Sequence, residues 1–167
     1  MQNFDDRDPT TFLFPALNHH TDEISCAIGS ASLLRLPDTI KRRRAWVAKL
    51  YEALEARSTV CGIYPNDDGD SPFLAPVMVD PARIDCTVVR FAEAVRAEGI
   101  ELNTCYKYVV DEWPWLERHL ADNFRTDNAR SIRDRTFLIK INENYGQTEL
   151  DDTIAAIVKV EQYFARR

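Results

Sequence analysis

Apolar residues recur every third or fourth position over the first third of the chain. From Thr21 to Leu34 they fall on one side of a helix. Thr21 suits the start of this helix, because its hydroxyl can cap free amides and the two acidic residues after it favour the positive end of the dipole. Pro37 predicts the end of this helix and the start of a second one, which extends to about Arg57. The first apolar face comprises Ile24, Ala27, Ile28, Ala31 and Leu34.

Short apolar runs on either side of a turn sequence predict a β-hairpin in the middle of the chain. Residues 60–64 and 73–79 read as strands, and the Asp-rich segment 65–70 between them is a strong turn signal. Pro76 indicates an edge strand or a bulge, because proline cannot donate to a ladder. The turn has neither the flanking helices nor the closing glutamate of an EF-hand, so a solvated hairpin is favoured over a calcium loop.

The second half of the chain alternates helices with short strands. The elements expected there are a helix from Pro81 or Ala82 to Gly99, a strand edge over 100–103, a short helix ending at Leu120, a helical turn over 128–134, a strand over 137–141, and a terminal helix that Thr148 and Asp151 open as a near capping box. The fold class predicted is α+β, with helices on one face of a small antiparallel or mixed sheet of three to four strands. Residues 1–17 are expected to form an irregular lead-in to one domain over 18–167.

Charge and cysteine content narrow the possible functions. The 167 residues carry a net charge of −6, which argues against a nucleic-acid or anionic-membrane partner. No apolar run reaches the roughly 18 residues of a membrane span, and the N-terminus does not resemble a secretory signal. The 4 cysteines are scattered without a CxxC pair, so a reduced, cytoplasmic protein without a zinc site is favoured over a disulfide framework. Cys26 and Cys86 fall in helical patterns and are interpreted as small core residues.

Two segments could bind an anion. The run Lys41-Arg42-Arg43-Arg44 is interpreted as a solvated helix face, with an anion site as the alternative. Asn18-His19-His20 lies just before a helix start, where backbone amides and side-chain donors suit a phosphate. Spacing alone favours a simpler interpretation, in which Asn18 and His19 satisfy backbone groups of the lead-in. No nucleophile, base and orienting group can be assembled from the sequence, so no catalytic residue is assigned.

The order of these features resembles a known enzyme family. The segment from Asn18 to Gly29 is similar to the Asn-Tyr-Arg-Met-x-Glu-x-x-Ala-Ala-Ile-Gly segment of the PLP-dependent sugar aminotransferases of the DegT/StrS type. Residues 33–36 fall where that family has Gln-Leu-x-x-Leu, and 40–51 where it has an Arg-Arg-rich helix. Residues 137–146 resemble its final strand and loop. His19 and His20 replace the usual Tyr and Arg, and the family's Pro-Leu-His segment is not evident.

The resemblance implies the small C-terminal domain of a fold-type I aminotransferase. The parent reaction would be amino transfer from glutamate or glutamine to a keto-sugar or cyclitol. In this family the preceding large domain carries the lysine that binds PLP, and none of the 5 lysines here lies in its Ser-x-x-Lys context. Because PLP chemistry needs that lysine, we expect the chain to be inactive on its own. A homodimer, or a complex with a large domain or aminotransferase, is the expected assembly.

The resemblance also assigns roles to residues. Asn18, with His19 and His20 beside it, matches the asparagine that contacts the PLP phosphate in the partner subunit. Tyr106 and Lys107 lie where the family's substrate-side segment would fall and are candidates for binding a nucleotide-sugar or cyclitol. Two other hypotheses stay open: a non-catalytic subunit or remnant that pairs with an aminotransferase, and an unrelated small binding module.

Overall fold

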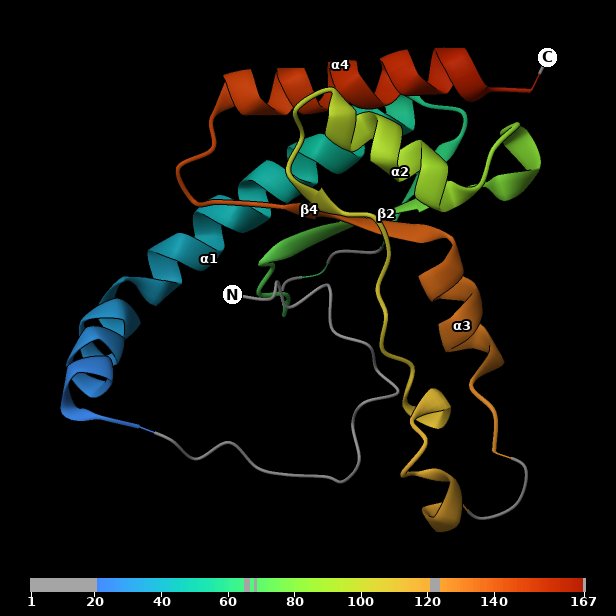
Figure 1. Cartoon of the computed structure of the whole chain (residues 1–167). Helices are drawn as coiled ribbons and strands as arrows, with labels where there is room; N and C mark the ends of the chain where they lie inside the picture. Colours follow the sequence, from blue (N-terminus) through green and yellow to red (C-terminus); the bar gives the residue numbers. More distant parts are fainter. Residues whose placement is uncertain (1–20, 65–66, 68, 121–123, 167) are drawn as a thin grey trace.

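The computed structural model describes residues 21–64, 67, 69–120 and 124–166, and Figure 1 traces the chain. Three helices cover one face of a four-stranded sheet, as the predicted α+β class requires. The helices and strands are α1 (Glu23–Arg57), β1 (Cys61–Ile63), β2 (Leu74–Val79), the 3₁₀ turn η3 (Pro81–Arg83), α2 (Val88–Ala97), β3 (Leu102–Asn103), the 3₁₀ turns η4 (Val110–Glu112) and η5 (Glu117–His119), α3 (Asp127–Asp134), β4 (Thr136–Lys140) and α4 (Gln147–Phe164). None of the described helices combines the length and the apolar character that crossing a membrane requires.

All neighbouring strands of the sheet are antiparallel, in the order β1-β2-β4-β3. The predicted hairpin forms between β1 and β2, with Gly62 opposite Met78. The strand edge predicted at 100–103 is β3, which pairs with the last strand, so that Leu102 lies opposite Ile139. The sheet is therefore completed only when the late strand β4 inserts between β2 and β3.

Pro76 lies in an interior strand, so the prediction that its strand is an edge is wrong. The register of β1 ends opposite Val77, one residue short of Pro76. The Pro76 carbonyl instead accepts a hydrogen bond of 2.9 Å from the Tyr51 hydroxyl. The amide nitrogen and the carbonyl of a strand residue point to the same side. The nitrogen of Pro76 therefore points beyond the end of β1, where no ladder hydrogen bond to β1 is lost.

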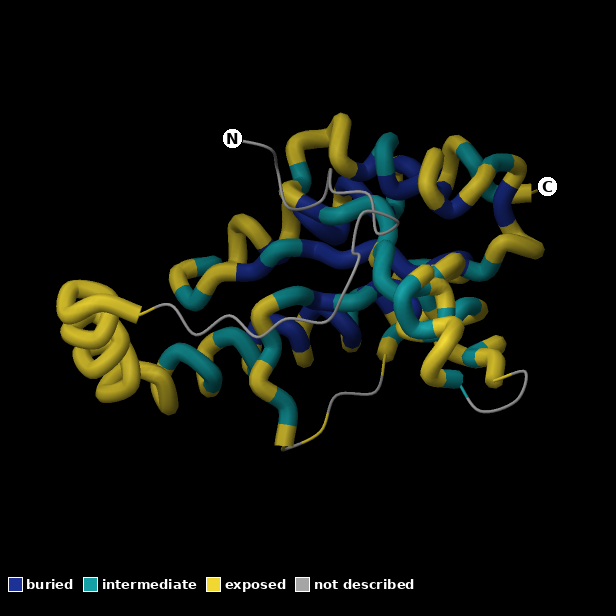
Figure 2. The backbone as a smooth tube through the Cα atoms, turned by 60° about the horizontal axis from the view of Figure 1, so that its bottom comes forward, coloured by how far each residue is buried: buried dark blue, intermediate teal, exposed yellow. Residues whose placement is uncertain are grey.

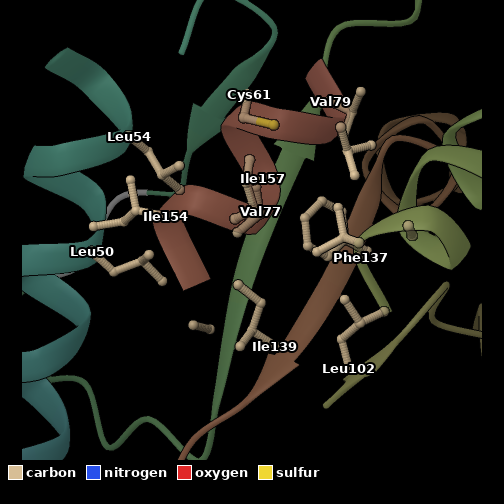
Figure 3. Close-up of a cluster of buried hydrophobic side chains, with 14 of the residues drawn as sticks. Leu50, Leu54, Cys61, Val77, Val79, Leu102, Phe137, Ile139, Ile154 and Ile157 are labelled. Carbon is tan, nitrogen blue, oxygen red and sulfur yellow. The ribbon is translucent and has the colours of Figure 1, made fainter. Parts of the chain in front are cut away.

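The hydrophobic core lies between the sheet and the helices. Alternate residues of β2, namely Ala75, Val77 and Val79, are buried on that face, as the period of a strand dictates. Figure 3 shows Leu50 and Leu54 of α1 pointing towards Ile154 and Ile157 of α4, above the strands. The core residues drawn there on the strands are Cys61, Val77, Val79, Leu102, Phe137 and Ile139.

The two long leading helices predicted from the sequence are one continuous helix. α1 runs through Pro37, and its N-cap is Asp22, whose carboxylate accepts from the Ser25 amide at 2.8 Å, rather than Thr21. Proline removes one backbone donor from a helix, but the residues on both sides of Pro37 are helical and α1 is continuous. Both the predicted break and the predicted cap were wrong.

The first half of α1 is not buried by the described part of the chain. Every residue from 21 to 38 is exposed, and Figure 2 shows this half in yellow, extending away from the buried centre. Ile24 is 74% exposed and Leu34 is 86% exposed. Cys26 is exposed too, which corrects its interpretation as a core residue, whereas Cys86 packs half-buried against the core.

Two later helices begin at other residues than predicted. The helix expected from Pro81 divides into the turn η3 and helix α2, which Thr87 caps by accepting from the Arg90 amide. Gly99 follows α2 with a φ of 98°, a conformation that glycine adopts without strain. The terminal helix starts before Thr148: the Gly146 amide donates to the Glu149 carboxylate at 2.7 Å, so Glu149 rather than Asp151 caps its start.

Candidate functional site

Two of the five predicted site residues fall in the described structure. Asn18, His19 and His20 lie outside the described residues. Tyr106 and Lys107 follow β3, and Tyr106 is 51% exposed while Lys107 is half-buried. The Tyr106 ring meets that of Tyr108 edge-on, with centroids 5.9 Å apart. Both candidates therefore lie on a segment that is partly open to solvent.

A hollow of about 460 Å³ lies beside this segment. It is bounded by the start of α2, the segment after β3, the end of α3 and the start of β4, and its lining residues are Thr87, Val88, Val89, Thr104, Cys105, Tyr106, Lys107, Arg133, Asp134 and Thr136. Two cations, Lys107 and Arg133, and one acid, Asp134, thus line the same hollow. The structure brings Lys107 into one hollow with Arg133 and Asp134, which no sequence pattern joins to it.

A second hollow of about 320 Å³ lies on the other side of Tyr106. Its lining is rich in aromatic and proline side chains: Val47, Tyr51, Tyr64, Asp70, Ser71, Pro72, Phe73, Leu74, Pro76, Tyr106 and Leu138. Burial, reinforced by the negative charge of Asp70, raises the pKa of Tyr51 well above its usual value. Tyr51 therefore stays neutral and keeps its hydrogen bond to Pro76. Flat apolar faces with a few polar groups suit a sugar or another ring-shaped ligand.

Buried polar contacts fix the segment that carries Tyr106. The Asp111 side chain is only 1% exposed, and it accepts from the Thr126 amide at 3.0 Å and hydroxyl at 2.6 Å and from Arg130 at 2.8 Å. The Thr126 hydroxyl, followed by the Thr126 amide and Arg130, lowers the pKa of Asp111 to about 2. A second ion pair joins Arg133 to Glu112. Figure 1 shows this segment descending from the sheet beside α3.

The tryptophans of the aromatic stretch lie apart from both hollows. Trp113 and Trp115 are half-buried and pack against each other, with centroids 5.6 Å apart. Neither lines the hollow on either side of Tyr106. They therefore stabilise the segment rather than face a ligand there.

The basic run at the middle of α1 is engaged in ion pairs. Arg43 binds Glu143 at 2.6 Å, and Arg42 binds Asp38 at 2.7 Å. A backbone hydrogen bond and then Arg43 lower the pKa of Glu143. Arg43 thereby fastens the loop after β4 to α1. These contacts favour the interpretation of the run as a structural, solvated face.

The described residues do not make a complete PLP site. Such a site needs a lysine for the Schiff base and an acid for the pyridine nitrogen. Lys140 and Lys159 are paired with Glu101 and Glu98, and Lys41 and Lys49 are exposed on α1. Lys107 shares its hollow with Asp134, but the Asp134 carboxylate already accepts from Arg133 at 2.8 Å. No group of three or more metal-binding side chains occurs within the described ranges either.

The aromatic lining of the second hollow was not foreseen from the sequence. Tyr64 and Phe73 flank the Asp-rich turn, and the pairing of β1 with β2 brings the two ends of the hairpin together. Tyr51 comes from α1 and reaches the same hollow only through packing. The aromatic residues at the two ends of the predicted hairpin, Tyr64 and Phe73, were the one feature of the sequence from which an aromatic hollow could have been predicted.

Comparisons with known proteins give a consistent result. The family model of the DegT/DnrJ/EryC1/StrS aminotransferases matches residues 2–158. No curated protein sequence matches the chain. Similar solved structures include an aminotransferase from Psychrobacter cryohalolentis (TM-score 0.70, 17% identity, 87% of this chain and 40% of that one). Helicobacter pylori PseC, an aminotransferase involved in the biosynthesis of pseudoaminic acid, is similar too (TM-score 0.69, 14% identity, 90% and 40%).

The structural matches cover most of this chain but only part of each relative. S. venezuelae DesV gives the same result, with a TM-score of 0.67, 18% identity, and coverage of 85% of this chain and 37% of DesV. The chain thus spans about two fifths of the length of the solved aminotransferases that it matches. The long leading helix and the antiparallel sheet correspond to part of the fold of fold-type I aminotransferases. Because the family model spans nearly the whole sequence, the chain belongs to the DegT/DnrJ/EryC1/StrS aminotransferase family.

Proposed function

We propose that the chain is the C-terminal part of a PLP-dependent aminotransferase that acts on a keto-sugar or cyclitol, with glutamate or glutamine as amino donor. The family match over residues 2–158 carries this proposal. One similar structure, PseC, is an aminotransferase involved in pseudoaminic acid biosynthesis, which supports a sugar-related substrate. The family match argues against the third hypothesis, an unrelated binding module.

The chain depends on another polypeptide region for the reacting lysine. The lysines of the chain support this, since none lies in the Ser-x-x-Lys context of the family and Lys140 and Lys159 form ion pairs with Glu101 and Glu98. PLP, held by that other region, would supply the electron sink of the reaction. Asn18 is proposed to contact the cofactor phosphate in a partner subunit, with His19 and His20 beside it. The complete enzyme would be a cytoplasmic dimer or a complex of this chain with a lysine-bearing partner.

Tyr106 and Lys107 are proposed to bind the sugar substrate. Tyr106 lies between an aromatic hollow and a hollow with two cations. In this proposal a sugar ring packs against the aromatic side and Lys107 binds a phosphate of a nucleotide-sugar. A non-catalytic subunit that supplies only these contacts is the second candidate, and the placement of the lysines favours it over a self-sufficient enzyme.

The proposal is tested by reconstituting transamination. The full chain is mixed with each lysine-bearing DegT-family protein of the source organism, with PLP, glutamate and a panel of keto-sugar nucleotides, and 2-oxoglutarate formation is followed. One mixture should gain activity that neither component has alone. Tyr106→Ala should raise the KM for the sugar roughly three- to tenfold, with kcat less affected.

Tyr163→Ala is the matched control, because Tyr163 is 81% exposed on α4 and lines neither hollow. It should leave the KM unchanged. Activity of the chain alone would contradict the dependence on a second region, and a binary mixture without activity in any pairing would contradict the proposed reaction.

A further inference from the structure

The residues that follow β3 line a hollow without any secondary structure of their own. Residues 104–109, here called the irregular span, lie between β3 and η4 and belong to neither a helix nor a strand. Within it, Thr104, Cys105, Tyr106 and Lys107 all line the hollow of about 460 Å³. Because no helix or strand fixes these four residues, the structures at the two ends of the span must place them.

The first end of the irregular span is held by the sheet. β3 is a strand of two residues, and its Leu102 lies opposite Ile139 of β4. The Lys140 amide also donates to the Glu101 carbonyl at 2.9 Å. This short strand fixes where the span begins. It leaves the direction of the following residues open, because each residue outside regular structure has several backbone conformations available.

The second end of the irregular span is held by a buried carboxylate. Val109 is 5% exposed, and the Asp111 side chain is 1% exposed. Asp111 accepts hydrogen bonds from the Thr126 amide, the Thr126 hydroxyl and Arg130. Hydrogen bonds to an ionised acceptor are roughly twice as strong as those between neutral groups. Asp111 lines neither hollow beside Tyr106, so it acts on a ligand there only through the residues before it.

The partners of this carboxylate belong to α3, whose other end lines the same hollow as the irregular span. Thr126 directly precedes α3, and Arg130 lies within the helix. Arg133 and Asp134, at the end of the helix, line the hollow of about 460 Å³. The contact of Asp111 therefore joins two parts of the wall of this hollow, and the spacing between them depends on it.

We infer that Asp111 is a positioning residue for the proposed sugar site, where it holds Tyr106 and Lys107 in place relative to the end of α3. The inference rests on the proposed function, which assigns these two residues to the substrate. Loss of the Asp111 carboxylate should lower the affinity for the sugar although Asp111 does not touch it. The chemical step should change less, because the reacting lysine belongs to another polypeptide region. The low pKa of Asp111 keeps the carboxylate ionised at neutral pH.

Glu161 offers a matched control in another part of the core. It is 7% exposed, and its carboxylate accepts from the amide and the hydroxyl of Thr59, as that of Asp111 does from Thr126. Neither Glu161 nor Thr59 lines a hollow beside Tyr106. Glu161→Ala should therefore destabilise the fold without moving the irregular span, whereas Asp111→Ala should do both.

The first measurement follows the irregular span through its own thiol. Cys105 lies in the span and is half-buried. Iodoacetamide alkylates each full-length variant, mass spectrometry of the peptides gives the rate at Cys105, and circular dichroism checks that the variants fold. The rate should be at least about threefold higher in Asp111→Ala than in Glu161→Ala. Asp111→Asn should restore most of the protection, because its amide can donate to the Thr126 hydroxyl while its oxygen accepts the other two bonds.

The second measurement is the KM for the sugar in the mixture that transaminates. Asp111→Ala should raise this KM roughly three- to tenfold, with kcat less affected, and Glu161→Ala should leave it within about twofold of the parent. Because Asp111 is inferred to act partly through Tyr106, combining Asp111→Ala with Tyr106→Ala should raise the KM by less than the product of the two single effects.

The two measurements separate this inference from the proposed function. Equal rates at Cys105 in Asp111→Ala and Glu161→Ala overturn the inference, whatever the activity. A transaminating mixture in which Asp111→Ala leaves the KM unchanged, or in which the effects at Asp111 and Tyr106 multiply, also overturns it and leaves the proposed function intact. Faster alkylation in Asp111→Ala without transamination in any mixture contradicts the proposed reaction and supports the positioning role.

Discussion

The two halves of α1 share one helix and differ in almost everything else. In the half that packs on the sheet, Leu50 and Leu54 are 0% exposed and form part of one wall of the core. The other half, residues 23–36 and called the projecting half, has apolar residues at the same helical spacing, yet all of its residues are exposed. Spacing therefore predicts that a helix has an apolar face, whereas the identity of what covers that face depends on the rest of the assembly.

The largest expected effect tests whether the two halves of α1 contribute differently to the free energy of unfolding, as their exposure indicates. Leu50→Ala should lower the free energy of unfolding by about 2–5 kcal/mol, because it leaves a cavity among α1, the sheet and α4. Leu34→Ala, in the projecting half, should change it by less than about 0.5 kcal/mol, because Leu34 is 86% exposed. Urea denaturation of the chain alone measures both values. Equal losses would show that the projecting half is packed in solution.

A smaller effect concerns the end of the packed half. The Glu161 carboxylate on α4 accepts from the Ser58 hydroxyl and from the Thr59 amide and hydroxyl, at 2.8 and 2.9 Å for Thr59. Glu161→Gln turns one acceptor into a donor among these groups and should cost about 2 kcal/mol. Lys159→Gln, which breaks the exposed pair with Glu98, should cost less than about 0.5 kcal/mol. A similar loss for both variants would mean that the hydrogen bonds of Glu161 to Ser58 and Thr59 contribute little to the free energy of unfolding.

Acid should loosen the segment that carries Tyr106. Because the contacts of Asp111 lower its pKa to about 2, against about 3.9 in the unfolded chain, its stabilising contribution is complete above pH 4 and is lost as the pH falls towards 2. Asp111→Asn should therefore flatten the decline in stability between pH 4 and pH 2. Thermal unfolding at several pH values measures the difference between variant and parent. An unchanged slope would assign the acid sensitivity to other carboxylates.

The smallest expected effect lies between the two halves. Pro37→Ala restores a backbone donor inside α1 and should slow amide hydrogen exchange in residues 23–36 a few-fold. Global stability should change by less than about 0.5 kcal/mol, because the described part of the chain buries none of these residues. A global change as large as that of Leu50→Ala would show that the two halves unfold as one unit.

Local signals were enough to predict most of the sheet and several helices. The hairpin of β1 and β2, helix α3 and strand β4 all match predicted ranges to within a residue or two. Turn residues and alternating burial act over a few positions, so they can be recognised in the sequence. Pro37 misled the prediction because a proline removes one backbone donor without always ending a helix, and the residues on both sides of Pro37 are helical.

The candidate site could be predicted only in part. Tyr106 and Lys107 were identified through a resemblance, and the structure gives them neighbours from α1, α2 and α3. Those neighbours are distant in the sequence, and no local pattern joins Tyr51 or Arg133 to Tyr106. Asp111 likewise gains its partners from a segment fifteen or more residues later. Contacts of this kind arise from packing, which single-sequence patterns do not encode.

The position of β4 has a consequence for synthesis on the ribosome. β4 is an inner strand, and Ala75 of β2 pairs with Ile139 of β4. The sheet therefore cannot form completely until β4 has been synthesised. The core also needs Ile154 and Ile157 of α4, near the end of the chain. Long-range pairing of this kind slows folding, so the domain can assemble only after nearly all of it has left the exit tunnel. During that interval α1 is already outside, and its apolar side chains are open to chaperones or to an earlier-folded neighbour.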